Sequence, residues 1–201
     1  MSYSAIAFSE AAKDFQRKAG SRASYARQEG HDIFDALTEN EIDFIACRDG
    51  FYMATTSESG YPYVQYRGGP KGFLKVLDEK RLGFIDFRGN RQFTSVGNLA
   101  TNNKVALILM DYPNRQRLKL FAEAAVMELK DHPALRKSLQ LENYQFIPER
   151  MLVFTVKAYN WNCPQHIVPR YTLEEVNVLF EPQLEYIAKL EAEIKSLKSP
   201  G

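Results

Sequence analysis

Hydrophobic positions follow a helical period near both ends of the chain and a period of two between them. In the first 48 residues, helical spacing covers residues 9–17 and 38–46, and the second segment opens on Thr38 and Glu41, a capping-box pair. Beyond them, short runs rich in aromatic and β-branched residues are typical of strands. These runs predict six or seven strands, at residues 51–56, 61–67, 73–77, 82–87, 105–110, 118–129 and 151–159.

Short connections join most of these runs. Residues 57–60, 78–81 and 111–115 are typical of hairpin turns, and short helices are predicted at residues 92–100 and 133–140. Strands joined by hairpins are antiparallel, and closing the sheet removes its exposed edges. The sequence therefore predicts a mainly β (α+β) protein, built as a closed or nearly closed antiparallel barrel with peripheral helices.

The last 40 residues return to a helical pattern. Thr172 and Glu175 form a second capping box, and Pro182 is predicted to break or restart the helix. A 3, 4, 3 spacing of apolar residues follows at Ile187, Leu190, Ile194 and Leu197. Two heptads are fewer than the three or four that identify a coiled coil, so a paired helix and a helix packed on its own barrel are both open.

Length and composition favour one domain. With 201 residues, of which 45% are hydrophobic, the chain can bury a substantial core. We expect a single domain over residues 1–201, with an N-terminal helical segment (1–48), a barrel (49–160), and a loop with a C-terminal helix (161–201).

Cysteine usage and hydropathy point to the cytoplasm. The two cysteines are too few for a disulfide framework and lack the spacing of a zinc site, so no metal is predicted. The first residues carry no signal-type apolar core, and no segment is apolar enough to span a membrane. We therefore expect a cytoplasmic protein without a membrane partner.

Charge is distributed unevenly along the chain. From Arg67 to Lys119 there are eleven Lys or Arg against four Asp or Glu, a local net charge of +7, whereas the whole chain carries only +1. The sequence pI of about 7.7 is low for a nucleic-acid-binding surface. This asymmetry favours one site for an anionic ligand.

Two basic turns concentrate that charge, at residues 66–72 and 86–92. Each places cationic side chains beside glycines at the end of a predicted strand, which gives a phosphate both fixed charge and a closely approaching backbone. Helix-start amides after Asn90 and the hydroxyl of Ser95 add further donors. The candidate ligands are Arg67, Gly68, Lys71, Arg88, Gly89, Asn90, Arg91, Gln92 and Ser95.

Several blocks of sequence resemble one family. Residues 54–63, the Arg67 turn, residues 82–87 and residues 98–107 are similar to the FMN-binding split barrel of pyridoxamine 5′-phosphate oxidase and its relatives. The resemblance is closer still to a subgroup of flavin-nucleotide-binding proteins. The blocks shared with that subgroup are residues 20–25, 89–98, 111–115 and 161–170.

The resemblance implies an antiparallel split β-barrel that binds FMN in a groove between the two subunits of a homodimer. It places the phosphate at Arg67, Arg88, Arg91, Gln92 and Ser95, with Lys71 a weaker candidate. A second set of residues is implied near the flavin ring. In this chain that set is Arg117, Trp161, Gln165, His166 and Arg170.

Within this second set, each side chain has a specific chemistry. The positive charge of Arg117 would raise the electron affinity of the flavin. The alternative is that Arg117 lies on the strand surface and pairs with an Asp or Glu on the neighbouring strand. Trp161, the only tryptophan, could stack on the ring or belong to the core. His166 is the one weak candidate for proton transfer, and a structural role is the alternative.

The chain also departs from the family pattern. The oxidases end in an Arg-Leu-x-Pro segment and carry an Arg-Leu-His stretch that grips the substrate phosphate, and neither occurs here. The main hypothesis is therefore an FMN-dependent oxidoreductase that acts by hydride transfer on another small molecule. The alternatives are a non-catalytic flavin-binding or carrier protein, and a haem-binding split barrel with His166 as ligand. Substrate, electron donor and the choice between FMN and a deazaflavin stay open.

Overall fold

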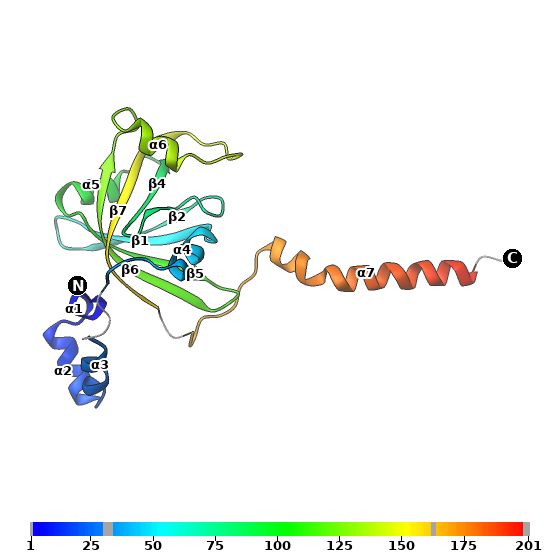
Figure 1. Cartoon of the computed structure of the whole chain (residues 1–201), viewed down its shortest axis with the longest axis horizontal. Coiled ribbons are helices and arrows are strands. Elements are labelled where there is room, and N and C mark those ends of the chain that lie inside the picture. Colours follow the sequence, from blue (N-terminus) through cyan, green and yellow to red (C-terminus); the bar gives the residue numbers. More distant parts are fainter. Residues whose placement is uncertain (1, 30–33, 162–163, 199–201) are drawn as a thin grey trace.

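Seven antiparallel strands curl into a split barrel in the computed structural model, which describes residues 2–29, 34–161 and 164–198 (Figure 1). The order of strands in the sheet is β2-β1-β5-β6-β7-β4-β3, so β2 and β3 form its two edges. The predicted mainly β, antiparallel barrel is confirmed. The strands are β1 (Gly50–Thr56), β2 (Pro62–Gly68), β3 (Lys75–Asp78), β4 (Arg81–Phe87), β5 (Lys104–Asp111), β6 (Gln116–Met127) and β7 (Pro148–Trp161).

Seven helices among the described residues surround or extend from the barrel. None of them is both long and apolar enough to cross a membrane. The short helices α1 and α3 had no signal in the hydrophobic pattern, whereas α2 matches the helical spacing predicted at residues 9–17 and has Ser9 as its N-cap. The helices are α1 (Tyr3–Ala7), α2 (Glu10–Lys18), α3 (Arg22–Glu29), α4 (Glu39–Ala46), α5 (Thr94–Thr101), α6 (Pro133–Leu139) and α7 (Leu173–Lys198).

Alternation along the strands builds the core. In β1 and β5 every second residue is buried, as expected for strands with one face toward the barrel interior. Four aromatic rings meet there with centroids 5.6–6.2 Å apart, in edge-on and stacked pairs. They are Phe51, Phe73, Phe84 and Phe154.

A buried carboxylate fixes α4 against the end of β7. Glu41 is only 2% exposed and accepts hydrogen bonds from the Thr38 hydroxyl (2.6 Å) and the Trp161 indole Nε1 (2.6 Å). Burial raises the pKa of this carboxyl, but the hydrogen bonds outweigh that effect and hold the pKa below its usual 4.5. Burial and the neighbouring Glu41 charge raise the pKa of Tyr159 to about 12.

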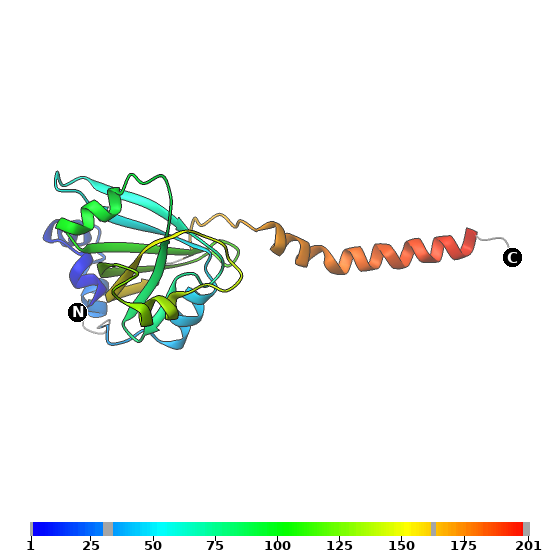
Figure 2. The ribbon, with the colours of Figure 1, turned by 90° about the horizontal axis from the view of Figure 1, so that it is seen from above.

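The C-terminal helix stands away from the barrel. α7 is 26 residues long, buries none of them, and projects outward in both views (Figures 1 and 2). The expected break at Pro182 was wrong, because the helix continues through it. A helix packed on its own barrel is not observed either.

Removing the Glu41 charge should destabilise the fold in a pH-dependent way. Because the folded pKa lies below the usual 4.5, the stability that ionised Glu41 contributes is present above that pH and lost as pH falls through the folded pKa. We expect Glu41→Gln to cost about 1–3 kcal/mol of unfolding free energy at pH 7 and less near pH 4. Urea denaturation at both pH values measures this, with Glu39→Gln, an exposed carboxylate in the same helix turn, as control. Equal losses in the two variants would refute this role for Glu41.

Candidate functional site

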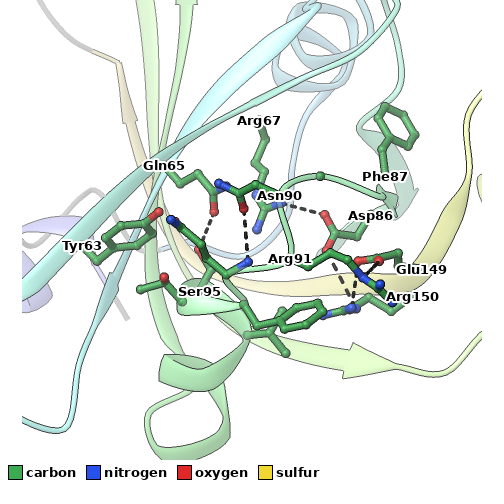
Figure 3. A pocket seen from close by; sticks show the side chains of 15 residues that line it. Tyr63, Gln65, Arg67, Asp86, Phe87, Asn90, Arg91, Ser95, Glu149 and Arg150 are labelled. Atoms are coloured by element: carbon green, nitrogen blue, oxygen red, sulfur yellow. Dashed lines mark hydrogen bonds and ion pairs between the residues drawn. The ribbon is translucent and has the colours of Figure 1, made fainter.

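A pocket opens where β2 and β4 face each other across the split of the barrel (Figure 3). It lies between the edge strand β2, the end of β4, the loop that follows β4, the start of α5 and the first residues of β7. Its lining residues are Tyr63, Gln65, Arg67, Asp86, Phe87, Gly89, Asn90, Arg91, Gln92, Phe93, Thr94, Ser95, Val96, Glu149 and Arg150.

Strand β2 supplies one wall through alternate residues. Tyr63, Gln65 and Arg67 are spaced by two, so they share the face that looks into the pocket. Val64 and Tyr66 lie on the opposite face and are exposed. The strand therefore presents polar side chains inward to the split and apolar ones outward.

The start of α5 forms the floor. The loop reaches it through two non-glycine residues with left-handed backbone, Arg91 (φ 61°) and Phe93 (φ 56°), an uncommon conformation that such residues adopt mostly at special sites. Phe93 is the N-cap residue, and its side chain makes no capping hydrogen bond. The first amides of a helix have no partner within the helix, so this uncapped end offers N–H donors and partial positive charge to the pocket.

Two side-chain hydrogen bonds hold α5 on the barrel. The buried Ser95 hydroxyl donates to Gln65 Oε1 at 2.8 Å, and Asn98 Nδ2 donates to Thr55 Oγ1 at 2.9 Å. The Gln65 amide keeps its two N–H donors in the pocket wall. The helix end is thus fixed relative to β2 and β1.

Asp86 organises the deepest charges. Its Oδ1 accepts from Arg67 Nη1 at 2.7 Å, and its Oδ2 lies 3.9 Å from Arg150 Nε, the residue paired with it across β4 and β7. Burial raises the pKa of Asp86, although both arginines oppose that shift. Arg67 Nε is buried and has no hydrogen-bond partner, so this guanidinium is held in place with a donor to spare.

Glu149 gathers the more exposed charges. Its Oε1 lies 3.5 Å from Arg88 Nε and 3.7 Å from Arg91 Nε, while Oε2 accepts from Arg150 Nη2 at 3.0 Å. Three arginines and two carboxylates line the pocket, a net charge of +1. Among the described residues, no group of three or more His, Cys, Asp or Glu could hold a metal ion. The arrangement suits an anion better than a cation.

The pocket brings together six of the residues singled out from the sequence. Arg88 adjoins it through Glu149 without lining it, Gly68 follows Arg67 at the end of β2, and Lys71 lies exposed on the next turn. The six lining residues are Arg67, Gly89, Asn90, Arg91, Gln92 and Ser95.

Arg117, Trp161 and Arg170, also predicted from the sequence, lie around the β5–β6 hairpin, outside this pocket. Arg117 is paired with Met110, and its Nε is buried without a partner. Trp161 donates to Glu41 and meets Phe44 edge-on at 4.7 Å. These contacts give Trp161 a structural role within the chain, and its stacking on a flavin stays a prediction.

The loop after β7 completes this second group. Arg170 lies over the Tyr112 ring at 5.1 Å, and Gln165 and His166 are exposed. Asn162 and Cys163 of the same sequence block lie outside the described residues. Contact of Gln165, His166 and Arg170 with a cofactor also stays a prediction.

Sequence reasoning missed several lining residues. The period of two along β2 could have added Tyr63 and Gln65 to Arg67. Glu149 and Arg150 had no local signal, because only the pairing of β4 with β7 brings them beside Asp86.

Fold and pocket together define a split-barrel protein with an arginine-lined pocket. Sequence comparison supplies the family. A family model described as Pyridoxamine 5′-phosphate oxidase (PNPOx_N) matches residues 37–158, more than half of the chain. The chain belongs to this family, as the resemblance in its sequence predicted. No curated protein matches the chain by sequence.

Two solved structures are similar to this chain. HupZ from Group A Streptococcus matches with a TM-score of 0.51 and 16% identity, over 67% of this chain and 99% of that one. An FMN-binding protein from Syntrophomonas wolfei subsp. wolfei matches with a TM-score of 0.49 and 14% identity, over 70% of this chain and 97% of that one. At such identity, the likeness to HupZ shows a shared fold and nothing about ligands.

The Arg67–Asp86 pair should couple strongly in a double-mutant cycle of Arg67→Gln and Asp86→Asn. The side chains are 14% and 7% exposed, so either single change leaves a buried charge short of its partner, and we expect a coupling of about 1–3 kcal/mol. The control pair, Arg81 and Asp78, is equally close at 2.6 Å but 55% and 38% exposed. Its cycle should give less than about 1 kcal/mol. Chemical denaturation measures both, and equal couplings would contradict the argument.

Proposed function

We propose that this protein is an FMN-dependent oxidoreductase, and that the pocket between β2 and α5 binds the FMN phosphate. The observation that carries the proposal is the convergence of the uncapped α5 N-terminus and the Arg67 guanidinium, which Asp86 holds in place, on one pocket of net positive charge. Family membership supports a flavin, since the family includes flavin-dependent oxidoreductases.

The donor set suits a phosphate. A phosphate dianion accepts several hydrogen bonds and prefers charged donors, and helix N-termini bind such groups readily. Arg67 is oriented in advance by Asp86, so little side-chain entropy is lost when it binds. Arg91 is 63% exposed and only loosely paired with Glu149 at 3.7 Å, so it can turn toward the anion.

The chain itself would bind and orient the cofactor. FMN, when bound, supplies hydride and electron transfer. Arg67, Arg91 and the α5 amides would hold its phosphate, while Gln65 and Ser95 keep the helix end in position. Arg117 would place a positive charge beside the ring and raise its electron affinity.

A second copy of the chain would complete the site. The outer face of β2, β1 and β5 exposes Tyr52, Val64, Tyr66 and Ile108, which lie next to one another in the strand register. An exposed apolar sheet face of this kind marks an interface. We therefore propose a homodimer, in which the 161–170 loop and Arg117 serve the flavin from the other side of the groove.

Loss of the two exposed arginines beside Glu149 should weaken FMN binding specifically. We expect Arg88→Ala with Arg91→Ala to raise the Kd for FMN at least roughly tenfold, because a hydrogen bond to a charged group contributes about 1.5–3 kcal/mol. Flavin fluorescence titration measures this, with Lys80→Ala plus Arg81→Ala as a control that removes the same number of charges outside the pocket. Riboflavin, which lacks the phosphate, should bind the wild type more weakly and be insensitive to the double change. Equal affinity of the wild type for FMN and riboflavin would refute the phosphate assignment.

The bound flavin should be reducible, but pyridoxamine 5′-phosphate should reduce it slowly or not at all. The segments with which the oxidases grip that substrate's phosphate are missing from this chain. Stopped-flow absorbance of the FMN-loaded protein, with dithionite as positive control, separates the outcomes. Rapid reduction by pyridoxamine 5′-phosphate would establish vitamin B6 oxidation instead. A carrier protein would bind FMN equally well but would catalyse no turnover with any electron donor, NADH and NADPH included.

A further inference from the structure

Helix α7 leaves an apolar stripe without a partner in the chain. Its 26 residues extend about 39 Å at 1.5 Å per residue, and none is buried. Helices in proteins draw most of their stability from packing an apolar face, and this one packs on nothing in the described chain (Figure 2). Its exposed large apolar side chains are Leu173, Val178, Leu179, Phe180, Leu184, Tyr186, Ile187, Leu190, Ile194 and Leu197.

The stripe follows a heptad repeat over the whole helix. In a heptad lettered a to g, positions a and d form the core of a coiled coil. When Ile187 is assigned to position a, every a and d residue is apolar except Gln183, which lies at d. Pro182 lies at a c position and has no backbone N–H, so the carbonyl of Val178, at an f position, has no helical hydrogen bond. Both positions lie on the side of the helix that faces away from the a and d residues. The a positions are Leu173, Phe180, Ile187 and Ile194, and the d positions are Val176, Gln183, Leu190 and Leu197.

Residue types and flanking charges favour another α7 as the partner. Ile at a with Leu at d, as in the last two heptads, favours a parallel two-stranded coil. In a parallel pair, g positions face e positions of the next heptad in the partner, which places Glu193 opposite Lys198 and Leu179 opposite Leu184. An antiparallel pair of full overlap would bring Glu193 near Leu179 and lose both matches.

We propose that α7 forms a parallel, in-register coiled coil of about four heptads with the α7 of a second copy of this chain. The two-fold axis along such a coil relates identical chains, so it is compatible with a symmetric dimer. The proposal goes beyond flavin binding and does not depend on it.

Disulfide trapping in the full-length chain tests both pairing and direction. In a background of Cys47→Ser and Cys163→Ser, a thiol introduced by Leu197→Cys at d should meet its own copy, so oxidised glutathione should convert most of the chain to a covalent dimer. The matched control is Ala192→Cys at f, on the outward side of the same helix, which should stay monomeric on a non-reducing gel. In an antiparallel pair, two copies of residue 197 would lie about 36 Å apart and could not link.

A core substitution separates pairing from chance collision. Added to Leu197→Cys, the a-position change Ile187→Asp should abolish the cross-link and lower the helical circular dichroism signal, whereas Lys189→Asp at the outward c position should change neither. Equal cross-linking of Leu197→Cys and Ala192→Cys, or a cross-link that survives Ile187→Asp, would overturn the proposal. FMN titration of the same variants should be unchanged, so a failure here is distinguishable from a failure of the flavin assignment.

Discussion

The ion pair between Arg67 and Asp86 bridges the split in the barrel. Arg67 sits on β2, one edge of the sheet, and Asp86 sits on β4, next to the other edge, so no ladder of backbone hydrogen bonds joins them. Removing two charges from water is costly unless the geometry is close, and here Arg67 and Arg150 share one buried carboxylate. The stability of the split and the shape of the pocket therefore depend on the same charges.

The arginines at the pocket differ in how deeply they are buried. The ion pair with Asp86 fixes the orientation of the Arg67 side chain, and the buried Arg67 Nε has no hydrogen-bond partner. Arg88 and Arg91 are about half or more exposed and lie 3.5–3.7 Å from Glu149, contacts that contribute little and exchange easily. In the proposed function, an anion would first meet the exposed Arg88 and Arg91, displace Glu149 from them, and then bind beside the buried Arg67.

The sequence predicted the elements that depend on residues close together in the chain, but not the contacts between residues far apart in it. All seven strands, and α2, α4, α5, α6 and α7, follow local sequence patterns, and the sequence predicted them. α3 was missed because its residues show almost no amphipathic period. Trp161 bonds to Glu41 across 120 positions, and Arg150 meets Asp86 only through the pairing of β4 with β7. No local pattern carries such partners, so the basic turns were predictable and the carboxylates that position them were not.

The proposed homodimer would explain why the predicted flavin residues lie in two separate regions of one chain. The predicted phosphate ligands lie at the split between β2 and β4, while Arg117, Trp161 and Arg170 lie around the β5–β6 hairpin. One barrel cannot bring two regions of its own surface together without unfolding, but a two-fold axis places one region of each subunit beside the other region of its partner. The exposed apolar face of β2, β1 and β5 and the unpaired seam of α7 are the surfaces that such an arrangement would cover. The separation of the predicted residues and the exposed apolar surface thus both support the proposed second copy of the chain.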